Sequence, residues 1–330
     1  MNIEAKLYDN VNEKAYDISS IIVGGCTISS FITDQPGKCT FQIMRDESPI
    51  FYEGATVAIK VDGKGIFKGY VVKFKQTGSD DTIEVTCLDQ LMYLRNKDAK
   101  VFEYMTCSQI FKKICNEWLL KYKIVDESNY ICAPRTFDNK TLYEMIKTSQ
   151  SDTLINSGEF YIIRDNFGTL EHISVKSLNA GVIIGDNMGL LDYDYESSID
   201  SDTYNQIKLY RDNTKTKKRE VFIVNDTING GDTLKRWGIL QLYEKVDDAL
   251  NKAQIEDKAR KMLNFYNRPK KTLKLESIGS FNVFAGSIIQ CYISELENDK
   301  TFNGYLLVTE CTHTLNNEEH TMSLRAEVYT

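Results

Sequence analysis

The sequence predicts an α+β fold in which two related β-modules are separated by an α+β lobe. The segment FKGYVV at 67–72 returns as FNGYLL at 302–307, and the strand-like segments around each copy follow in the same order. Helix-start signals at Thr106 and Thr141 fall between the two copies. Because a further helical pattern precedes the second copy, the second module is expected to carry a helical insertion.

The first module is expected to consist of strands punctuated by glycine. An alternating segment at 40–43 leads to Gly54, where a positive φ or a close backbone approach is expected before the next strand at 56–59. FKGYVV follows, and a polar turn then precedes a last strand at 82–85. Gly69 lies within a strand, where glycine commonly marks a bulge or a bend that curls a sheet into a small barrel.

The second module repeats this order. A strand at 272–275 leads to Gly286, and a second strand follows at 287–293. FNGYLL then places Gly304 inside a strand, and a polar turn opens a last strand at 321–324. A duplicated module brings its neighbours along in order, so we interpret the two segments as copies of one barrel strand.

The repeated strand is apolar on both faces. In FKGYVVKF, Phe67 and Val71 are expected on one face, and Tyr70, Val72 and Phe74 on the other. A strand that is apolar on both faces is covered on both, by its own core and by another domain or subunit. The candidate barrel or subunit contacts are therefore Phe67, Gly69, Tyr70, Phe302, Gly304 and Tyr305.

The region between the modules has helical signals. Thr106 and Thr141 each begin a capping-box pattern followed by apolar residues at helical spacing, and a turn at 165–168 joins two strands of a hairpin. The hairpin of NQIKLYRD and REVFIVND is assigned to the second module, and a helix is expected from about 247 to 266. The expected domains are a first tube-like β-barrel (1–96), a middle α+β lobe (97–185), the first part of a second tube-like β-barrel (186–225), a helical insertion (226–268) and the remainder of the second barrel (269–330).

Charge and composition exclude several classes of protein. The formal net charge is −7, and the lysines and arginines are largely dispersed, so no continuous basic footprint for stable nucleic-acid binding is expected. The eight cysteines form no CxxC pair and are predicted to be reduced core residues of a protein made in the cytoplasm. Neither a secretory signal nor a run of apolar residues long enough to span a membrane is expected.

The search for catalytic motifs is mostly negative. We find no phosphate loop, nucleophile elbow or HExxH motif, and predict no catalytic residue, cofactor or metal. His172 is expected to be a half-exposed strand residue. If Asn316 and Asn317 form a two-residue turn, His313 and His320 face each other across a hairpin, but two imidazoles are too few ligands for zinc.

Motifs along nearly the whole chain occur in a recognisable order. They are Gly54, the segment 67–71, Asp89 with Leu91 and Leu94, then Asp165, Gly168 and Leu170, and finally a helix at 249–262, Gly286 and His313. In this order they resemble the baseplate hub proteins of contractile phage tails, of the late-control protein D type.

The resemblance implies a structural hub rather than an enzyme. Such hubs form homotrimers in which two tube-like barrels per chain make a ring of pseudo-six-fold symmetry. The ring would join the tail tube protein to the central spike protein and the baseplate wedge proteins, around a channel for DNA or a tape-measure protein. The expected protein is assembled into the tail of a phage or a tail-like bacteriocin, and its negative charge suits a channel that must not retain DNA.

Two alternatives involve the segment LLDYDYESS. A peptidoglycan-degrading tail hydrolase would use paired carboxylates, for which Asp192 and Asp194 are the better candidates. A glycan-binding tail protein would instead use the ring faces of Tyr193 and Tyr195.

Overall fold

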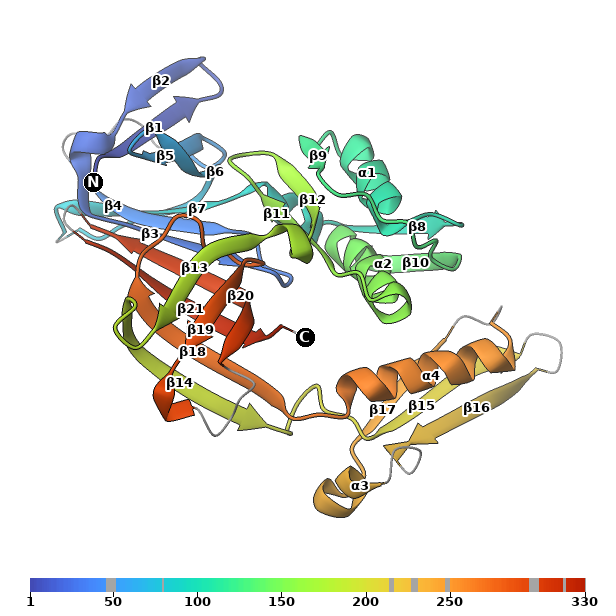
Figure 1. Ribbon diagram of the computed structural model, residues 1–330. Helices are drawn as coiled ribbons and strands as arrows, with labels where there is room; N and C mark the ends of the chain where they lie inside the picture. The colour runs from blue at the N-terminus through green and yellow to red at the C-terminus, as the bar shows by residue number, and fades with distance from the viewer. Residues whose placement is uncertain are drawn as a thin grey trace.

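The computed structural model describes residues 1–45, 52–78, 80–213, 217–226, 231–246, 250–296, 303–316 and 319–329. Strands from both ends of the chain join a single 13-stranded sheet (Figure 1). Two helix-containing parts lie to one side of this sheet in the view of Figure 1. The predicted α+β class is confirmed, with large antiparallel sheets as its main component.

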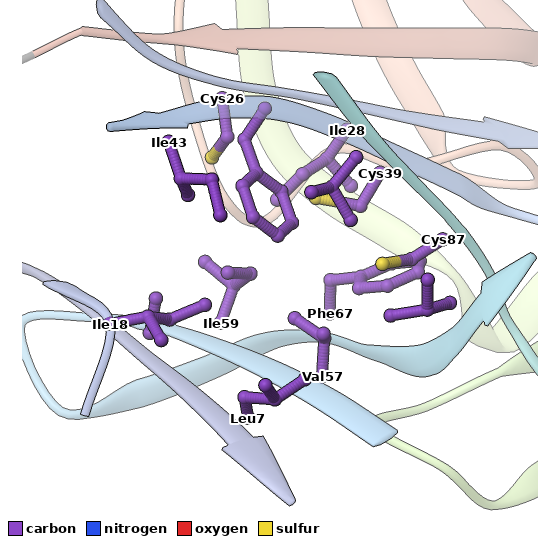
Figure 2. Close-up of a cluster of buried hydrophobic side chains, with 14 of the residues drawn as sticks. Leu7, Ile18, Cys26, Ile28, Cys39, Ile43, Val57, Ile59, Phe67 and Cys87 are labelled. Carbon is purple, nitrogen blue, oxygen red and sulfur yellow. The ribbon is translucent and has the colours of Figure 1, made fainter. Parts of the chain in front are cut away.

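The N-terminal strands form what we call the first β-unit. Its elements are β1 (Ile3–Asp9), β2 (Lys14–Asp17), η1 (Ser19–Ile21), β3 (Ile22–Phe31), β4 (Lys38–Met44), β5 (Thr56–Val61), β6 (Lys64–Gln76) and β7 (Thr82–Leu88). The strands pair in the order β3-β4-β7-β6-β5-β1-β2. Figure 2 shows the apolar side chains of this unit meeting between two layers of strands, with Cys26 and Ile43 on one side and Leu7 and Ile59 on the other.

The C-terminal strands form the second β-unit. Its elements are β13 (Asn179–Gly185), β14 (Leu190–Ser198), β18 (Lys270–Ile278), β19 (Ile288–Tyr292), η5 (Ser294–Leu296), β20 (Gly304–Leu315) and β21 (His320–Val328). The strands pair in the order β14-β18-β21-β20-β19-β13, which repeats β3-β4-β7-β6-β5-β1 strand for strand. One pairing differs, because β13 is parallel to β19 whereas β1 is antiparallel to β5.

The glycines have two separate roles. Gly54 and Gly286 have φ values of +91° and +99°, as predicted for the residue before a strand. Of the bulge or bend predicted at Gly69, the bulge is wrong, because the ladder between β6 and β7 skips Val72 instead. This bulge turns Phe74 to the same face as Val71, opposite Val85 of the core, which corrects the predicted face of Phe74.

The middle lobe follows the first β-unit. Its elements are η2 (Gln90–Arg95), β8 (Lys97–Phe102), α1 (Cys107–Glu117), β9 (Tyr122–Ile124), β10 (Arg135–Thr141), α2 (Leu142–Ser157), β11 (Tyr161–Asp165), β12 (Leu170–Ser174) and η3 (Val175–Ser177). Thr106 and Thr141 cap α1 and α2 with complete capping boxes, which confirms both predicted helix starts. The predicted hairpin is the pair β11 and β12.

A separate unit lies between β14 and β18. Its elements are β15 (Gln206–Asn213), β16 (Lys218–Asn225), α3 (Asp232–Trp237), β17 (Gln241–Lys245) and α4 (Lys252–Tyr266). The strands pair in the order β16-β15-β17, so the assignment of the β15–β16 hairpin to the second β-module is wrong, and the insertion is not purely helical. The physical reason is that Ile207 and Leu209 of β15 bury their side chains against Ile255 and Met262 of α4.

All eight cysteine side chains are buried, as predicted for core residues. Within the described ranges, each helix is too short or too polar to traverse a lipid bilayer.

Candidate functional site

The most extensive candidate site is one face of the large sheet, which we call the polar face. It covers the eight strands β14-β18-β21-β20-β3-β4-β7-β6, on the side away from the two apolar cores. A row of threonines crosses it, formed by the paired residues Thr314, Thr27, Thr40 and Thr86. Since this row passes from β20 to β3 without a break, the polar face is continuous across both β-units.

Charges of both signs alternate on the polar face. Lys274 Nζ lies 3.1 Å from Asp194 Oδ2, and Arg325 Nη1 lies 3.7 Å from Glu310 Oε1. These side chains are 42–67% exposed, so each pair contributes little to stability. Their effect is to leave a hydrophilic surface on which acidic and basic side chains lie side by side. The sequence signal for this face was the alternation of Thr, Ser and charged residues along each strand, which sequence analysis did not connect into one surface.

Backbone hydrogen bonds define which residues of the two β-units correspond. Gly54 N donates to Val71 O at 2.8 Å, and Gly286 N donates to Val308 O at 2.7 Å. Val71 therefore corresponds to Val308. The match of FKGYVV with FNGYLL is displaced by two residues from this structural correspondence, although the strands themselves are equivalent.

The displacement changes the role of the candidate tyrosines. Tyr70 corresponds to Leu307, and both pack against parts of the molecule outside their own core. The Tyr70 ring meets the Tyr93 ring edge to face at a centroid distance of 5.5 Å, and Leu307 is buried beside Val175 and Leu178. Tyr305 corresponds instead to Lys68 and is 49% exposed.

The other candidate contacts have different surroundings. Phe67 is buried in the core of the first β-unit. A Cβ at Gly69 would overlap the carbonyl oxygen of Leu88, whereas a Cβ at Gly304 would meet nothing within 4 Å. Phe302 lies outside the described residues.

A cavity of about 500 Å³ lies where the two β-units meet the middle lobe. Asp89 accepts hydrogen bonds from Gly37 N and Leu91 N, and Asp165 accepts one from Gly168 N at 2.6 Å. Burial raises the pKa of Asp165 to about 6, and burial followed by the nearby Asp165 charge raises that of Asp89. Both carboxylates hold turns in place through backbone amides, and the second oxygen of Asp165, Oδ2, is buried without a hydrogen-bond partner in the described part of the chain.

His172 is fully buried, which corrects the prediction of a half-exposed residue. Its Nδ1 lies 3.1 Å from the carbonyl oxygen of Asp126 and donates to it, so Nε2 faces the Cys107 thiol, 3.5 Å away, as an acceptor. The ring stacks on Tyr161, and burial lowers the pKa of His172 to about 4. The neutral imidazole is therefore part of the core of the middle lobe.

His313 and His320 do approach each other, but with a different register. His313 pairs with Met322, and Leu315 pairs with His320, so the predicted pairing of His313 with His320 is wrong by two residues. His313 Nε2 donates to Val283 O at 2.9 Å, and its Nδ1 accepts from His320 Nε2 at 2.9 Å. Both ring nitrogens of His313 are thus occupied, and the described ranges contain no group of three or more His, Cys, Asp or Glu residues suited to a metal.

The residues of the two alternative functions lie on opposite faces of β14. Asp192 and Asp194 are exposed on the polar face, two residues apart on one strand, so they do not flank a groove as glycosidase carboxylates do. Tyr193 and Tyr195 pack against the core of the second β-unit.

Comparison with solved structures places this fold among tail proteins. The chain is similar to the 43 kDa tail protein of prophage MuSo2 from Shewanella oneidensis, with a TM-score of 0.68 and 10% identity, over 99% of this chain and 98% of that one. At this identity the likeness establishes the fold. The resemblance to tail hub proteins inferred from the motif order is thereby confirmed at the level of the fold.

The chain belongs to the YQBQ-like family, which it matches over residues 26–327. It is 27% identical over 275 residues to the uncharacterized protein YqbQ of Bacillus subtilis (strain 168), covering 82% of this chain and 80% of YqbQ. It is 26% identical over 275 residues to the phage-like element PBSX protein XkdQ of the same strain, covering 82% of this chain and 81% of XkdQ.

Proposed function

We propose that this protein is the structural hub of a tail baseplate, in which three copies close a ring of pseudo-six-fold symmetry around a central channel. The observation that carries the proposal is the polar face, which runs unbroken across two β-units with the same order of strand pairing. Two related units per chain allow a three-fold assembly to present six similar surfaces. The similarity to the MuSo2 tail protein and to XkdQ of a phage-like element supports the same role.

The polar face would line the channel. Its threonines and alternating charges offer neither an apolar patch nor the continuous positive charge that binds a phosphate backbone. Together with a net charge of −7, this surface would let DNA or a tape-measure protein pass without being retained. The ring would bind a tail tube protein, a central spike protein and baseplate wedge proteins, and its role would be non-enzymatic.

The division of the chain into domains that fits this role follows the boundaries of its apolar cores. We assign 1–96 to the first tube-like domain and the following residues up to about 178 to the middle lobe. The second tube-like domain would comprise the second β-unit, interrupted by the unit around α4. In this division the inserted unit and the middle lobe lie outside the ring wall, available to other baseplate proteins.

Imaging of the purified full-length chain tests the ring directly. We expect particles of three chains with a central hole in negative-stain class averages, and a mass of three chains by mass photometry. A chain that remains monomeric at all concentrations, alone and when mixed with the tail tube and spike proteins of its particle, would contradict the proposal.

A further inference from the structure

The two β-units of one chain are joined by a strand pairing that can serve as the pattern for a contact between copies of the chain. β3 of the first β-unit pairs antiparallel with β20 of the second, from Phe31 opposite Glu310 to Cys26 opposite Leu315. On the polar face, Thr312 Oγ1 donates to Ser29 Oγ at 2.9 Å across this junction. The junction lies on the edge of β20 that β19 leaves uncovered beyond Leu307.

The repeated pairing order gives each partner in this junction a counterpart in the other unit. β14 corresponds to β3, since β14 pairs with β18 as β3 pairs with β4. β6 corresponds to β20. Residues paired across neighbouring strands give the residue correspondence. In the first β-unit one such row is Phe74, Val85, Phe41 and Cys26. The matching row of the second β-unit is Cys311, Leu324, Leu275 and Tyr193.

Both counterpart edges lack a strand partner in the described ranges. β14 ends the 13-stranded sheet, and among the described strands β18 is the one that forms a ladder with its residues from Asp192 to Ser198. β6 pairs with β5 only as far as Tyr70, so its last residues, from Lys73 to Gln76, pair with β7 alone. Unpaired edges of this kind are templates for pairing with another chain.

We infer that β14 of one copy pairs antiparallel with the end of β6 in the next copy, in the register of the β3–β20 junction. Ser29 and Thr312 correspond to Glu196 and Lys75, which would lie directly opposite each other on the polar face. Lys73 would lie opposite Ser198 in the same way. This inference rests on the proposed ring and specifies the contact that closes it.

Charge and exposure on the two edges are complementary. β14 carries Asp192, Asp194 and Glu196 on the polar face, whereas the end of β6 carries Lys73 and Lys75 there. Opposite charges placed directly across a strand pair stabilise it. On the other face Phe74 is 41% exposed at the margin of its core, and the new pairing would cover it with Ser197.

Cysteine cross-linking tests the register in the full-length chain. The variant Lys75→Cys/Glu196→Cys should form covalent species of two and three chains under mild oxidation, seen on non-reducing gels. The matched control Lys73→Cys/Glu196→Cys has the same cysteine count and face but is displaced by two residues, and should cross-link far less. The native cysteines are all buried, and the unsubstituted chain shows their background.

Charge exchange tests the ion pair independently. Lys75→Glu and Glu196→Lys should each weaken self-association, measured by sedimentation equilibrium, roughly five-fold, because like charges then oppose each other in the pairing. The double exchange Lys75→Glu/Glu196→Lys should restore most of the association. The side chains of Lys75 and Glu196 are both exposed, so folding is expected to be unaffected, as circular dichroism would show.

The outcomes separate this inference from the proposed function. A three-chain ring that cross-links at 75 and 196 supports both. A ring that forms normally but cross-links only in the displaced control, or not at these edges, overturns the inference and leaves the hub intact. A chain that never assembles overturns both.

Discussion

The two β-units share an order of strand pairing but differ in what covers their equivalent strands. In the first β-unit, Tyr70 of β6 lies against Tyr93 of η2, the element that comes directly after this β-unit in the sequence. In the second, the equivalent Leu307 of β20 lies in an apolar cluster with Val175 and Leu178, more than a hundred residues away. One topology therefore accepts different side chains at corresponding positions, provided that each neighbouring element is adapted to them.

The largest expected effect distinguishes the structural correspondence from the sequence match. Leu307→Ala should lower the free energy of unfolding by roughly 3 kcal/mol, because it leaves a cavity in a buried cluster. Tyr305→Ala should change it by less than about 0.5 kcal/mol, because the side chain is half exposed and its counterpart is Lys68. Urea unfolding of both variants measures the difference. Equal losses would contradict the two-residue displacement.

The two-residue displacement between the sequence match and the structural correspondence shows which parts of the fold the sequence could predict. The starts of α1 and α2 were predictable because capping boxes are local, and Gly54 and Gly286 because a positive φ favours glycine. The exact alignment of FNGYLL was not, because a shift of two residues leaves every side chain on the same face. The backbone bonds of Val71 and Val308, and the strand ladders aligned with them, distinguish the two alignments.

The same limit explains why the sequence predicted neither the sheet to which the β15–β16 hairpin belongs nor the polar face. Alternation in NQIKLYRD predicts a half-buried strand but not which sheet it joins, and α4 supplies the apolar surface that determines this. The threonine row similarly depends on the β3–β20 pairing between residues nearly three hundred positions apart. No local pattern predicts such a contact, so the continuous surface was visible only in the structure.

The glycines of the two repeated strands should differ in their tolerance of a side chain. Gly69→Ala is expected to destabilise the protein by roughly 2 kcal/mol, because its Cβ would collide with the Leu88 backbone. Gly304→Ala is the matched control, and it should be neutral within about 0.5 kcal/mol because there is space around it. Thermal unfolding of the two variants in parallel provides the comparison. If Gly304→Ala proved the more harmful, the assignment of close packing to the first β-unit alone would be incorrect.

The response to pH should also differ between the units. Burial, with a smaller contribution from His320, lowers the pKa of His313 to about 4, whereas its first-unit counterpart is the exposed, uncharged Gln76. Between pH 6.5 and 4 the unfolded chain binds a proton at this histidine that the folded chain does not, so stability falls as pH falls through that window. Wild type should lose roughly 2 kcal/mol through this group between pH 7.5 and pH 5.

The variant His313→Gln isolates this contribution by giving β20 the residue found in β6. Urea unfolding at pH 7.5 and at pH 5 should show a smaller difference between the two pH values than in wild type, whatever the variant's stability at pH 7.5. His172 has the same direction of shift in the middle lobe and remains as an internal reference. An unchanged pH dependence would mean that His313 does not stay neutral when folded.

The smallest expected effect concerns the edge strand of the second β-unit. Asp194 corresponds to Thr27, which lies between two paired strands, whereas Asp194 has β18 on one side and solvent on the other. Asp194→Asn removes the charge opposite Lys274, yet the isolated chain should lose less than about 0.5 kcal/mol, because both side chains are more than half exposed. Urea unfolding at low and high salt measures this loss. A larger loss in the monomer would show that the β14 edge already stabilises the single chain. It would then be a weaker candidate for the surface that pairs with the neighbouring copy.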